Sequence, residues 1–249
     1  SSGGLFSEAC GLALPNAPGN AFLPKVGALS DDLREIVEGY NSLTPEFRPQ
    51  IDGYFALGGA SKSDLRGIKT GNLACIVTDA ADNEFGNDNC YEQRDQTRSM
   101  LETSTFQTFL EEVKVRSAGA NKVFVVLWDH GGGFNGFGGA IDSSYIKGPY
   151  VLGLNEIAEA FQKSSLKADI IGFDACLMGG METLYKLKDS ANYLLGSVEL
   201  EPGSGWSYQD IIRFVATNPK ASSEDISKVV IERFTRTGES IMFADHSST

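Results

Sequence analysis

Five short apolar runs, separated by longer amphipathic segments, give this chain its pattern. The runs occupy residues 51–57, 72–78, 122–128, 168–173 and 193–198. The runs at 122–128 and 168–173 are almost continuously apolar, which is typical of strands buried on both faces of a parallel sheet. Both of these runs stop at small polar residues and glycine. We therefore expect two buried strands whose ends carry chemically distinctive residues.

The segments between the runs have apolar residues three and four positions apart and predict helices. At Ser104 the side chain of Gln107, three residues on, completes a capping-box pattern. A further helix is predicted to begin directly after Cys176, with Leu177, Met181 and Leu184 on one face. Strands that alternate with helices predict an α/β fold with a mainly parallel central sheet. The predicted helix starts are Ser30, Ser104, Asn155, Leu177, Ser207 and Ser222.

Length and charge narrow the class of protein. A chain of 249 residues suits a single domain, taken here as residues 1–249. Its first and last residues, Ser1–Gly4 and Phe243–Thr249, resemble the interior of a longer chain, so we expect the domain to be incomplete at both ends. The net charge of −12 argues against binding to nucleic acid, which needs a basic face. No apolar stretch approaches the roughly 18 residues that cross a membrane, so no span is predicted.

A thiol and an imidazole follow the two buried runs. Asp129-His130-Gly131 comes directly after the run at 122–128, and Asp174-Ala175-Cys176 ends the run at 168–173. Reacting groups gather at the carboxyl ends of parallel strands. We therefore expect Cys176 and His130 to face one solvent-open cleft as nucleophile and base. A helix beginning at Leu177 would also lower the pKa of the thiol through its dipole.

Each of these residues also has a plainer interpretation. Free cysteine is most often a buried structural residue, and a histidine at a strand end is often only hydrogen-bonded. The occurrence of both motifs in one chain favours the catalytic interpretation. Cys10, Cys75 and Cys90 fit a structural role better, and without C-x-x-C spacing they predict no zinc site.

Other motifs fit less well. The glycines of 131–136 match a dinucleotide-binding pattern, but the residues that follow do not favour the helix that such a site needs. The acidic loop with Asp79, Asp82 and Asp88 lacks EF-hand spacing, so a solvated turn is favoured over a calcium site. Calcium therefore stays an open alternative, and no cofactor is expected to be required.

The two motifs together resemble those of clostripain-like cysteine peptidases, which share a caspase-like fold with caspases, legumain and gingipains. The matching blocks are Asp129–Gly133 and Asp174–Gly179, with support from Phe55–Ala60, Gly86–Asn89 and Glu199–Trp206. The resemblance runs from about Ile51 to Tyr208 and implies a three-layer α/β/α sandwich. It also implies peptide or protein substrates and a secreted or cell-envelope location in a bacterium.

The resemblance assigns a role to each site residue. Cys176 would attack the peptide carbonyl to form a thioester, with His130 as acid and base. The backbone N–H groups of Gly131 and Cys176 would stabilise the oxyanion. Cleavage after Arg or Lys is implied, with Asp174 as the acid that pairs with the basic side chain and Glu201 as a second candidate. For Asp174 a strand-end cap is the alternative.

Self-processing is the last property that the resemblance implies. Lys147 lies in a loop-like segment between the two motifs, so Lys147–Gly148 is the predicted cleavage site. The protein would then be a monomer or a pair of processed light and heavy chains. Two other classes of protein stay open: a non-catalytic relative that binds peptides, and a cysteine amidohydrolase that acts on small amides.

Overall fold

The structure is a computed structural model that describes residues 28–58, 74–78, 101–138, 151–202 and 205–236. The elements are α1 (Ala28–Asn41), η1 (Arg48–Gln50), β1 (Tyr54–Gly58), β2 (Ala74–Thr78), α2 (Thr103–Arg116), β3 (Phe124–Trp128), η2 (Gly133–Asn135), α3 (Leu154–Ser164), β4 (Ala168–Asp174), α4 (Met181–Leu187), β5 (Ala191–Gly196), α5 (Tyr208–Thr217) and α6 (Ser223–Arg236).

All the described strands pair in parallel. Strands β3, β4 and β5 form one sheet in that order, and β1 pairs with β2. In the three-stranded sheet Phe124 is opposite Ile170, and Trp128 is opposite Asp174. This register aligns the carboxyl ends of β3 and β4. The predicted α/β class and parallel pairing are confirmed.

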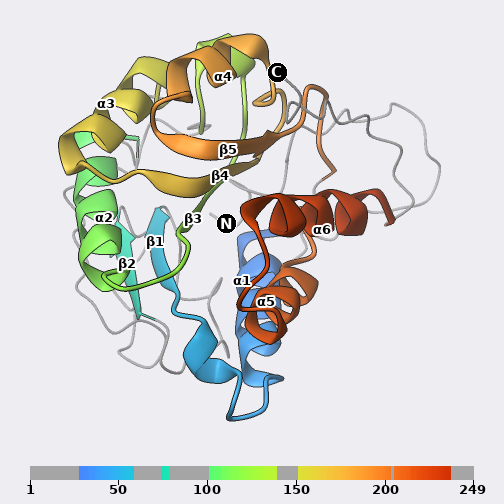
Figure 1. Ribbon diagram of the computed structural model, residues 1–249. Coiled ribbons are helices and arrows are strands. Elements are labelled where there is room, and N and C mark those ends of the chain that lie inside the picture. Colours follow the sequence, from blue (N-terminus) through green and yellow to red (C-terminus); the bar gives the residue numbers. More distant parts are fainter. Residues whose placement is uncertain (1–27, 59–73, 79–100, 139–150, 203–204, 237–249) are drawn as a thin grey trace.

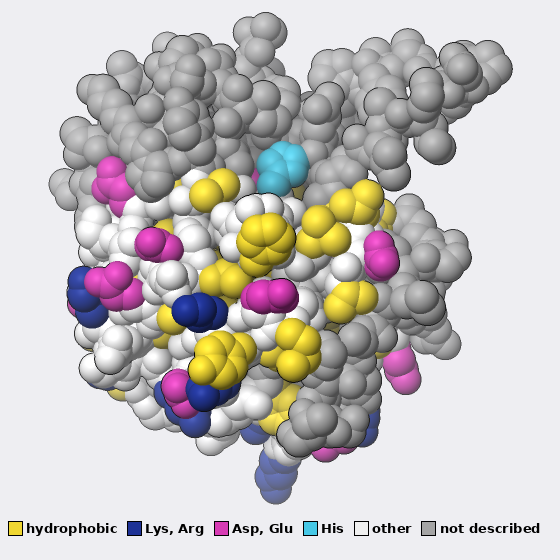
Figure 2. Space-filling model, turned by 90° about the horizontal axis from the view of Figure 1, so that it is seen from above, with side chains coloured by type: hydrophobic (Ala, Val, Ile, Leu, Met, Phe, Trp, Pro, Cys, Tyr) yellow, Lys and Arg dark blue, Asp and Glu magenta, His cyan; other side chains and the backbone are white. Residues whose placement is uncertain are grey.

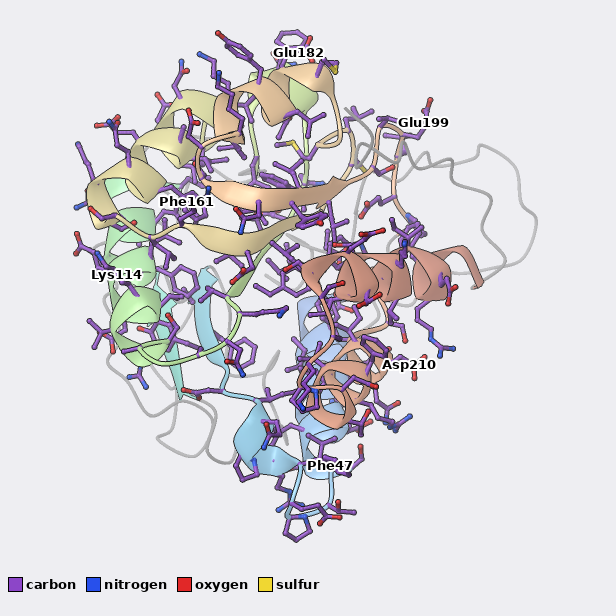
Figure 3. The ribbon with its side chains drawn as sticks, viewed as in Figure 1. Phe47, Lys114, Phe161, Glu182, Glu199 and Asp210 are labelled. Atoms are coloured by element: carbon purple, nitrogen blue, oxygen red, sulfur yellow. The ribbon has the colours of Figure 1, made fainter. Side chains whose placement is uncertain are left out.

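Helices cover both faces of the three-stranded sheet (Figure 1). On one face, α2, α3 and α4 pack over a core that includes Phe161, which is labelled in Figure 3, and Ile171 and Phe173. On the other face, α1, α5 and α6 pack over Ile170, Trp206 and Phe234. Side chains on β4 alternate between these two cores, because successive residues of a strand point to opposite faces. The result is the three-layer α/β/α arrangement that the resemblance implied.

Several details differ from the sequence-based predictions. Helix α2 has Glu102 at its N-cap with no side-chain capping bond, so the Ser104–Gln107 capping box is wrong. Gln107 instead donates to Glu111 within the helix. The strand β3 is fully buried on one face only, whereas β4 is buried on nearly all positions. At α6 the prediction is confirmed, since Ser222 and Asp225 cap each other.

Candidate active site

The register of the sheet places the two motifs side by side. Trp128 and Asp174 are paired across β3 and β4, and His130 and Cys176 each come two residues later on their own strand. The end of β3 and the end of β4 therefore present the imidazole and the sulfur at equivalent positions. The register aligns the two strand ends, and the meeting of the His130 and Cys176 side chains stays a prediction.

The loops that follow the two strands are in direct contact. A Cβ atom built on Gly131 would lie 1.9 Å from the carbonyl oxygen of Cys176 and 2.8 Å from the Met178 side chain. Only a residue without a side chain allows this approach. The N–H of Gly131 makes no hydrogen bond within the described part of the chain, so it can donate one to an oxyanion.

The backbone after Cys176 is a tight turn, not a helix. Leu177 has a φ of 62°, in the left-handed region that a leucine rarely adopts, and α4 begins only at Met181. The prediction of a helix directly after Cys176 is wrong, and with it the expectation that a helix dipole lowers the pKa of the thiol. The apolar spacing of Leu177, Met181 and Leu184 fits a helix, but the buried positions of α4 are Thr183 and Leu187.

The segment after β5 covers Cys176. The N–H of Glu201 donates to the Cys176 sulfur at 3.0 Å, and the N–H of Leu177 donates to the carbonyl of Glu199 at 3.0 Å. Cys176 is 0% exposed, and its sulfur is in a disulfide bond. The expected solvent-open cleft is therefore absent at this residue in the described structure. In this state the sulfur is not a nucleophile, because only the thiolate attacks.

The backbone of His130 is held on both sides. Its N–H donates to Oδ1 of Asp129 at 2.6 Å, and its carbonyl accepts a hydrogen bond from Gly138 at 2.8 Å. Burial raises the pKa of Asp129 to about 7, although the hydrogen bond from His130 opposes the rise. His130 is half-buried, and it is the single histidine in the described ranges.

Asp174 lies on the opposite side of the strand from Phe173 and is buried. Its Oδ2 accepts hydrogen bonds from the Tyr208 hydroxyl at 2.7 Å and from the N–H of Trp206 at 3.0 Å. Burial raises the pKa of Asp174, and these two bonds partly offset the rise. The carboxylate thus fastens the start of α5 to the end of β4. This contact gives Asp174 a structural role at the end of β4, next to its predicted role in binding a basic side chain.

Glu201 lies beside Asp174 and is 6% exposed. Its carboxyl oxygens lie close to Asp174, the N–H of Ala175 and the Trp206 indole, which all act on its pKa, but neither oxygen makes a hydrogen bond of good geometry within the described residues. Burial raises the pKa of Glu201 to about 10, and the Asp174 charge adds to the rise. The nearby indole N–H of Trp206 also lacks a partner there. Such unmet acceptors are costly in a protein interior unless a cation or a proton satisfies them.

Asp32 is a third buried acid at this place, and the sequence analysis did not identify it as a site residue. A Cβ atom built on Gly205 would lie 2.9 Å from Asp174 Oδ2 and 3.2 Å from Asp32 Oδ2. Gly205 has a φ of 59°, which also favours glycine. The charges of Asp32, Asp174 and Glu201 all act to raise the pKa of Tyr208. An acid placed from α1, far away in sequence, leaves no local signal.

Comparison with models of protein families identifies the family of this chain. The model of the clostripain family matches residues 27–248. This chain belongs to the clostripain family. The match includes both motif blocks and the acidic residues around Asp174. A search of curated proteins finds no match to this clostripain-family chain.

One solved structure agrees with the fold of this clostripain-family chain, and a second is similar to part of it. An inactive zymogen C11 protease from Parabacteroides distasonis has a TM-score of 0.51 and 23% identity, covering 75% of this chain and 58% of its own. A secreted C11 cysteine protease from Bacteroides thetaiotaomicron, in complex with an irreversible peptide inhibitor, has a TM-score of 0.44 and 21% identity, covering 55% and 37%. This chain thus spans less than two thirds of either protein.

Some predicted features of the clostripain-family chain lie outside the described residues. These are the Lys147–Gly148 bond, the acidic loop with Asp79, and the side chains of Cys10, Cys75 and Cys90. In the part that the structure describes, no group of three His, Cys, Asp or Glu residues has the arrangement of a metal site. No helix among those residues is long and apolar enough to cross a membrane.

Proposed function

We propose that this chain is the peptidase domain of a cysteine endopeptidase that cleaves after Arg or Lys. The observation that supports the proposal is the paired register of β3 and β4, which presents His130 and Cys176 at equivalent positions beyond Trp128 and Asp174. A thiol and an imidazole at adjacent strand ends can act as nucleophile and acid/base. The contact between their loops at Gly131 keeps the two motifs together.

The reaction follows from these positions. The Cys176 thiolate adds to the scissile carbonyl, whose oxygen gains the charge and accepts hydrogen bonds from the N–H groups of Gly131 and Cys176. The C–N bond then breaks as the His130 imidazolium gives its proton to the leaving amine. A thioester remains on Cys176. His130 next takes a proton from water, the hydroxide releases the carboxylic acid, and the thiolate returns.

The basic-residue preference rests on three buried carboxyl groups. Asp32, Asp174 and Glu201 lie around Gly205 and Tyr208, on the far side of β4 from the α4 layer. Two of the oxygens, those of Glu201, make no hydrogen bond of good geometry among the described residues. A guanidinium or ammonium group entering here would gain a charge-assisted hydrogen bond to Glu201 and a close charge on Asp174. An uncharged side chain would leave these groups unsatisfied.

The described structure corresponds to a resting form of this enzyme. Cys176 is oxidised, and the segment at Glu199 and Glu201 lies over it. Catalysis therefore needs reduction of the sulfur and displacement of this segment. Self-cleavage at Lys147–Gly148 is the processing step that the family resemblance favours. It would yield light and heavy chains from a monomer.

The remaining properties follow from the same proposal. Its partners are peptide and protein substrates, and a secreted or cell-envelope location in a bacterium is proposed from the secreted neighbour. No cofactor is needed for the chemistry of Cys176 and His130. Calcium is kept as a variable of the test, because the acidic loop with Asp79 lies outside the described residues.

A fluorogenic peptide panel tests the proposal. Reduced full-length protein is assayed on peptides with Arg, Lys, Asn or Asp at the residue before the cleaved bond, with and without calcium. We expect cleavage after Arg and Lys only, and none by Cys176→Ala. Cleavage of small amides but not of peptides would instead identify an amidohydrolase. Peptide binding without cleavage by the reduced protein would identify a non-catalytic relative, which the covered state of Cys176 would then explain.

A further inference from the structure

An exposed apolar surface lies directly beside the two motifs. Phe134 is 74% exposed and Met181 69% exposed, and Leu177 and Tyr185 are also exposed. We call these four residues the apolar surface. In Figure 2 hydrophobic side chains gather on the face next to the histidine. Large apolar groups clustered on one surface indicate a binding site more often than scattered ones do.

The apolar surface is built from the same loops as the motifs. Leu177 is the residue after Cys176, and Phe134 lies in η2, four residues after His130. A Cβ atom on Gly133 would lie 3.3 Å from the Leu177 carbonyl oxygen and 3.9 Å from its Cβ. Helix α4, which bears Met181, contacts η2. Any peptide that reaches Cys176 and His130 therefore passes next to these side chains.

The three buried carboxyl groups and the apolar surface lie on opposite sides of the sheet. Asp174 points toward Trp206 and Tyr208, in the layer of α1, α5 and α6. The apolar surface lies on the side of α4, whose Leu187 packs into the other core. Successive side chains of an extended peptide point to opposite sides. When a basic side chain points to Asp174, the residues before and after it point toward the apolar surface.

The position of His130 shows which of the two substrate residues, the one before or the one after the basic residue, contacts the apolar surface. The leaving amine belongs to the residue after the cleaved bond, and it must reach the imidazole that protonates it. Phe134 is in the loop of His130, so it lies on the leaving-group side. We infer that the apolar surface binds an apolar side chain at the residue directly after the cleaved bond, and that Phe134, Leu177 and Met181 contribute most to this binding. This inference rests on the proposed function and adds a second determinant of specificity.

Internally quenched peptides test the inference. Each has Arg before the cleaved bond, Gly in front of that Arg, and Leu, Ser or Asp directly after the bond. With reduced full-length protein we expect kcat/KM for the Leu peptide to exceed that for the Ser peptide by roughly tenfold, as for other apolar subsites. Phe134→Ser and Met181→Ser should each reduce this ratio toward one. The control Val115→Ser changes an exposed apolar residue of α2 and should keep the ratio.

The ratio separates the possible failures. A folding defect lowers kcat/KM for both peptides equally and leaves the ratio unchanged, so the two serine variants stay informative. If no arginyl peptide is cleaved, the proposed function itself fails. If arginyl peptides are cleaved but the ratio is near one in the unmutated protein, the inference is overturned. A change of oligomeric mass in Met181→Ser, measured by sedimentation, would assign the surface to a second copy and would also overturn it.

Discussion

Gly131 lies against the backbone of Cys176 so closely that its α-carbon has no room for a side chain. A Cβ atom there would lie 1.9 Å from the Cys176 carbonyl oxygen. We predict that Gly131→Ala forces the two loops apart and lowers kcat/KM by at least about 100-fold, since displacements of about 1 Å have this effect. It should also lower the melting temperature, because overpacking against backbone costs about 1–3 kcal/mol or more.

Gly132→Ala is the matched control for this prediction. Its Cβ would meet Asn135 Cβ at 3.3 Å and the carbonyl oxygen of Gly136 at 3.4 Å, contacts that small shifts relieve. We expect near-normal peptide cleavage and stability. If both alanine variants behave alike, the close approach of the two loops is not what holds the site together.

Reduction of Cys176 is expected to control labelling. Its sulfur is in a disulfide bond, so the protein purified without reductant should not react with an arginyl chloromethylketone. After treatment with dithiothreitol we expect one label per chain, found on Cys176 by mass spectrometry, because only a thiolate displaces the chloride. Cys176→Ala should take none. Equal labelling before and after reduction would show that oxidation does not block the site.

The fold and the alignment of the two strand ends could be predicted from the sequence. The apolar runs that became β3 and β4 contain few polar residues for a physical reason, since every position of β4 except Asp169 is buried. Parallel strands of similar length align their ends, so residues that follow them meet. His130 and Cys176 could therefore be paired without knowing any contact between them.

The covering of Cys176 was beyond the reach of the sequence. It depends on two hydrogen bonds of the main chain, from the Glu201 N–H to the Cys176 sulfur and from the Leu177 N–H to the Glu199 carbonyl. Because backbone groups are the same for every residue type, the sequence does not reveal these bonds. The helix predicted at Leu177 failed because periodic apolar spacing does not reveal a left-handed φ at one position. Asp32 joins Asp174 only through the packing of α1 on α5, a tertiary contact without a local pattern.

Asp174→Asn separates the specificity role of this acid from its structural role. Asparagine keeps an oxygen that can accept from Trp206 and Tyr208 but loses the charge. We predict that kcat/KM for arginyl peptides falls by about 100-fold, because the basic side chain loses the close negative charge of Asp174. The matched variant Tyr208→Phe removes the hydroxyl that donates to Asp174 and should cost about 1 kcal/mol of stability. It should keep the preference for Arg, measured as the ratio of arginyl to neutral peptides. An unchanged ratio in Asp174→Asn would leave this acid with a structural role alone.

Self-cleavage predicts a difference in chain composition on denaturing gels. We expect the reduced full-length protein to separate into two chains and Cys176→Ala to remain single. Lys147→Ala should also remain single, because the basic residue before the bond is lost. Lys163→Ala is the control, since Lys163 lies within α3 and pairs with Glu159, and a helical peptide bond does not fit an extended cleft. If the unmutated protein and Cys176→Ala migrate as identical single chains, self-cleavage at Lys147–Gly148 does not occur.

Asp129 should give the stability of the protein a particular dependence on pH. Its pKa is raised by burial from 3.8 to about 7, so between these values the folded state keeps a proton that the unfolded state has lost. The free energy of unfolding should therefore fall as pH rises from about 4 to about 7, and this contribution is constant above that window. Asp129→Asn removes the titration and keeps an oxygen for the His130 N–H. We expect its stability relative to the unmutated protein to increase with pH across this window in urea unfolding experiments.

Asp225→Asn provides a control of opposite sign. The Ser222 hydroxyl and N–H lower the pKa of Asp225, so its contribution is present above pH 4 and is lost as pH falls through the lowered pKa. This variant should therefore be less stable than the unmutated protein at neutral pH, and the difference should disappear in acid. If Asp129→Asn shows the same trend as Asp225→Asn, the carboxyl beside His130 is ionised in the folded protein well below neutral pH. In that case Asp129 would hold the His130 backbone as a permanent anion and would not titrate alongside the imidazole.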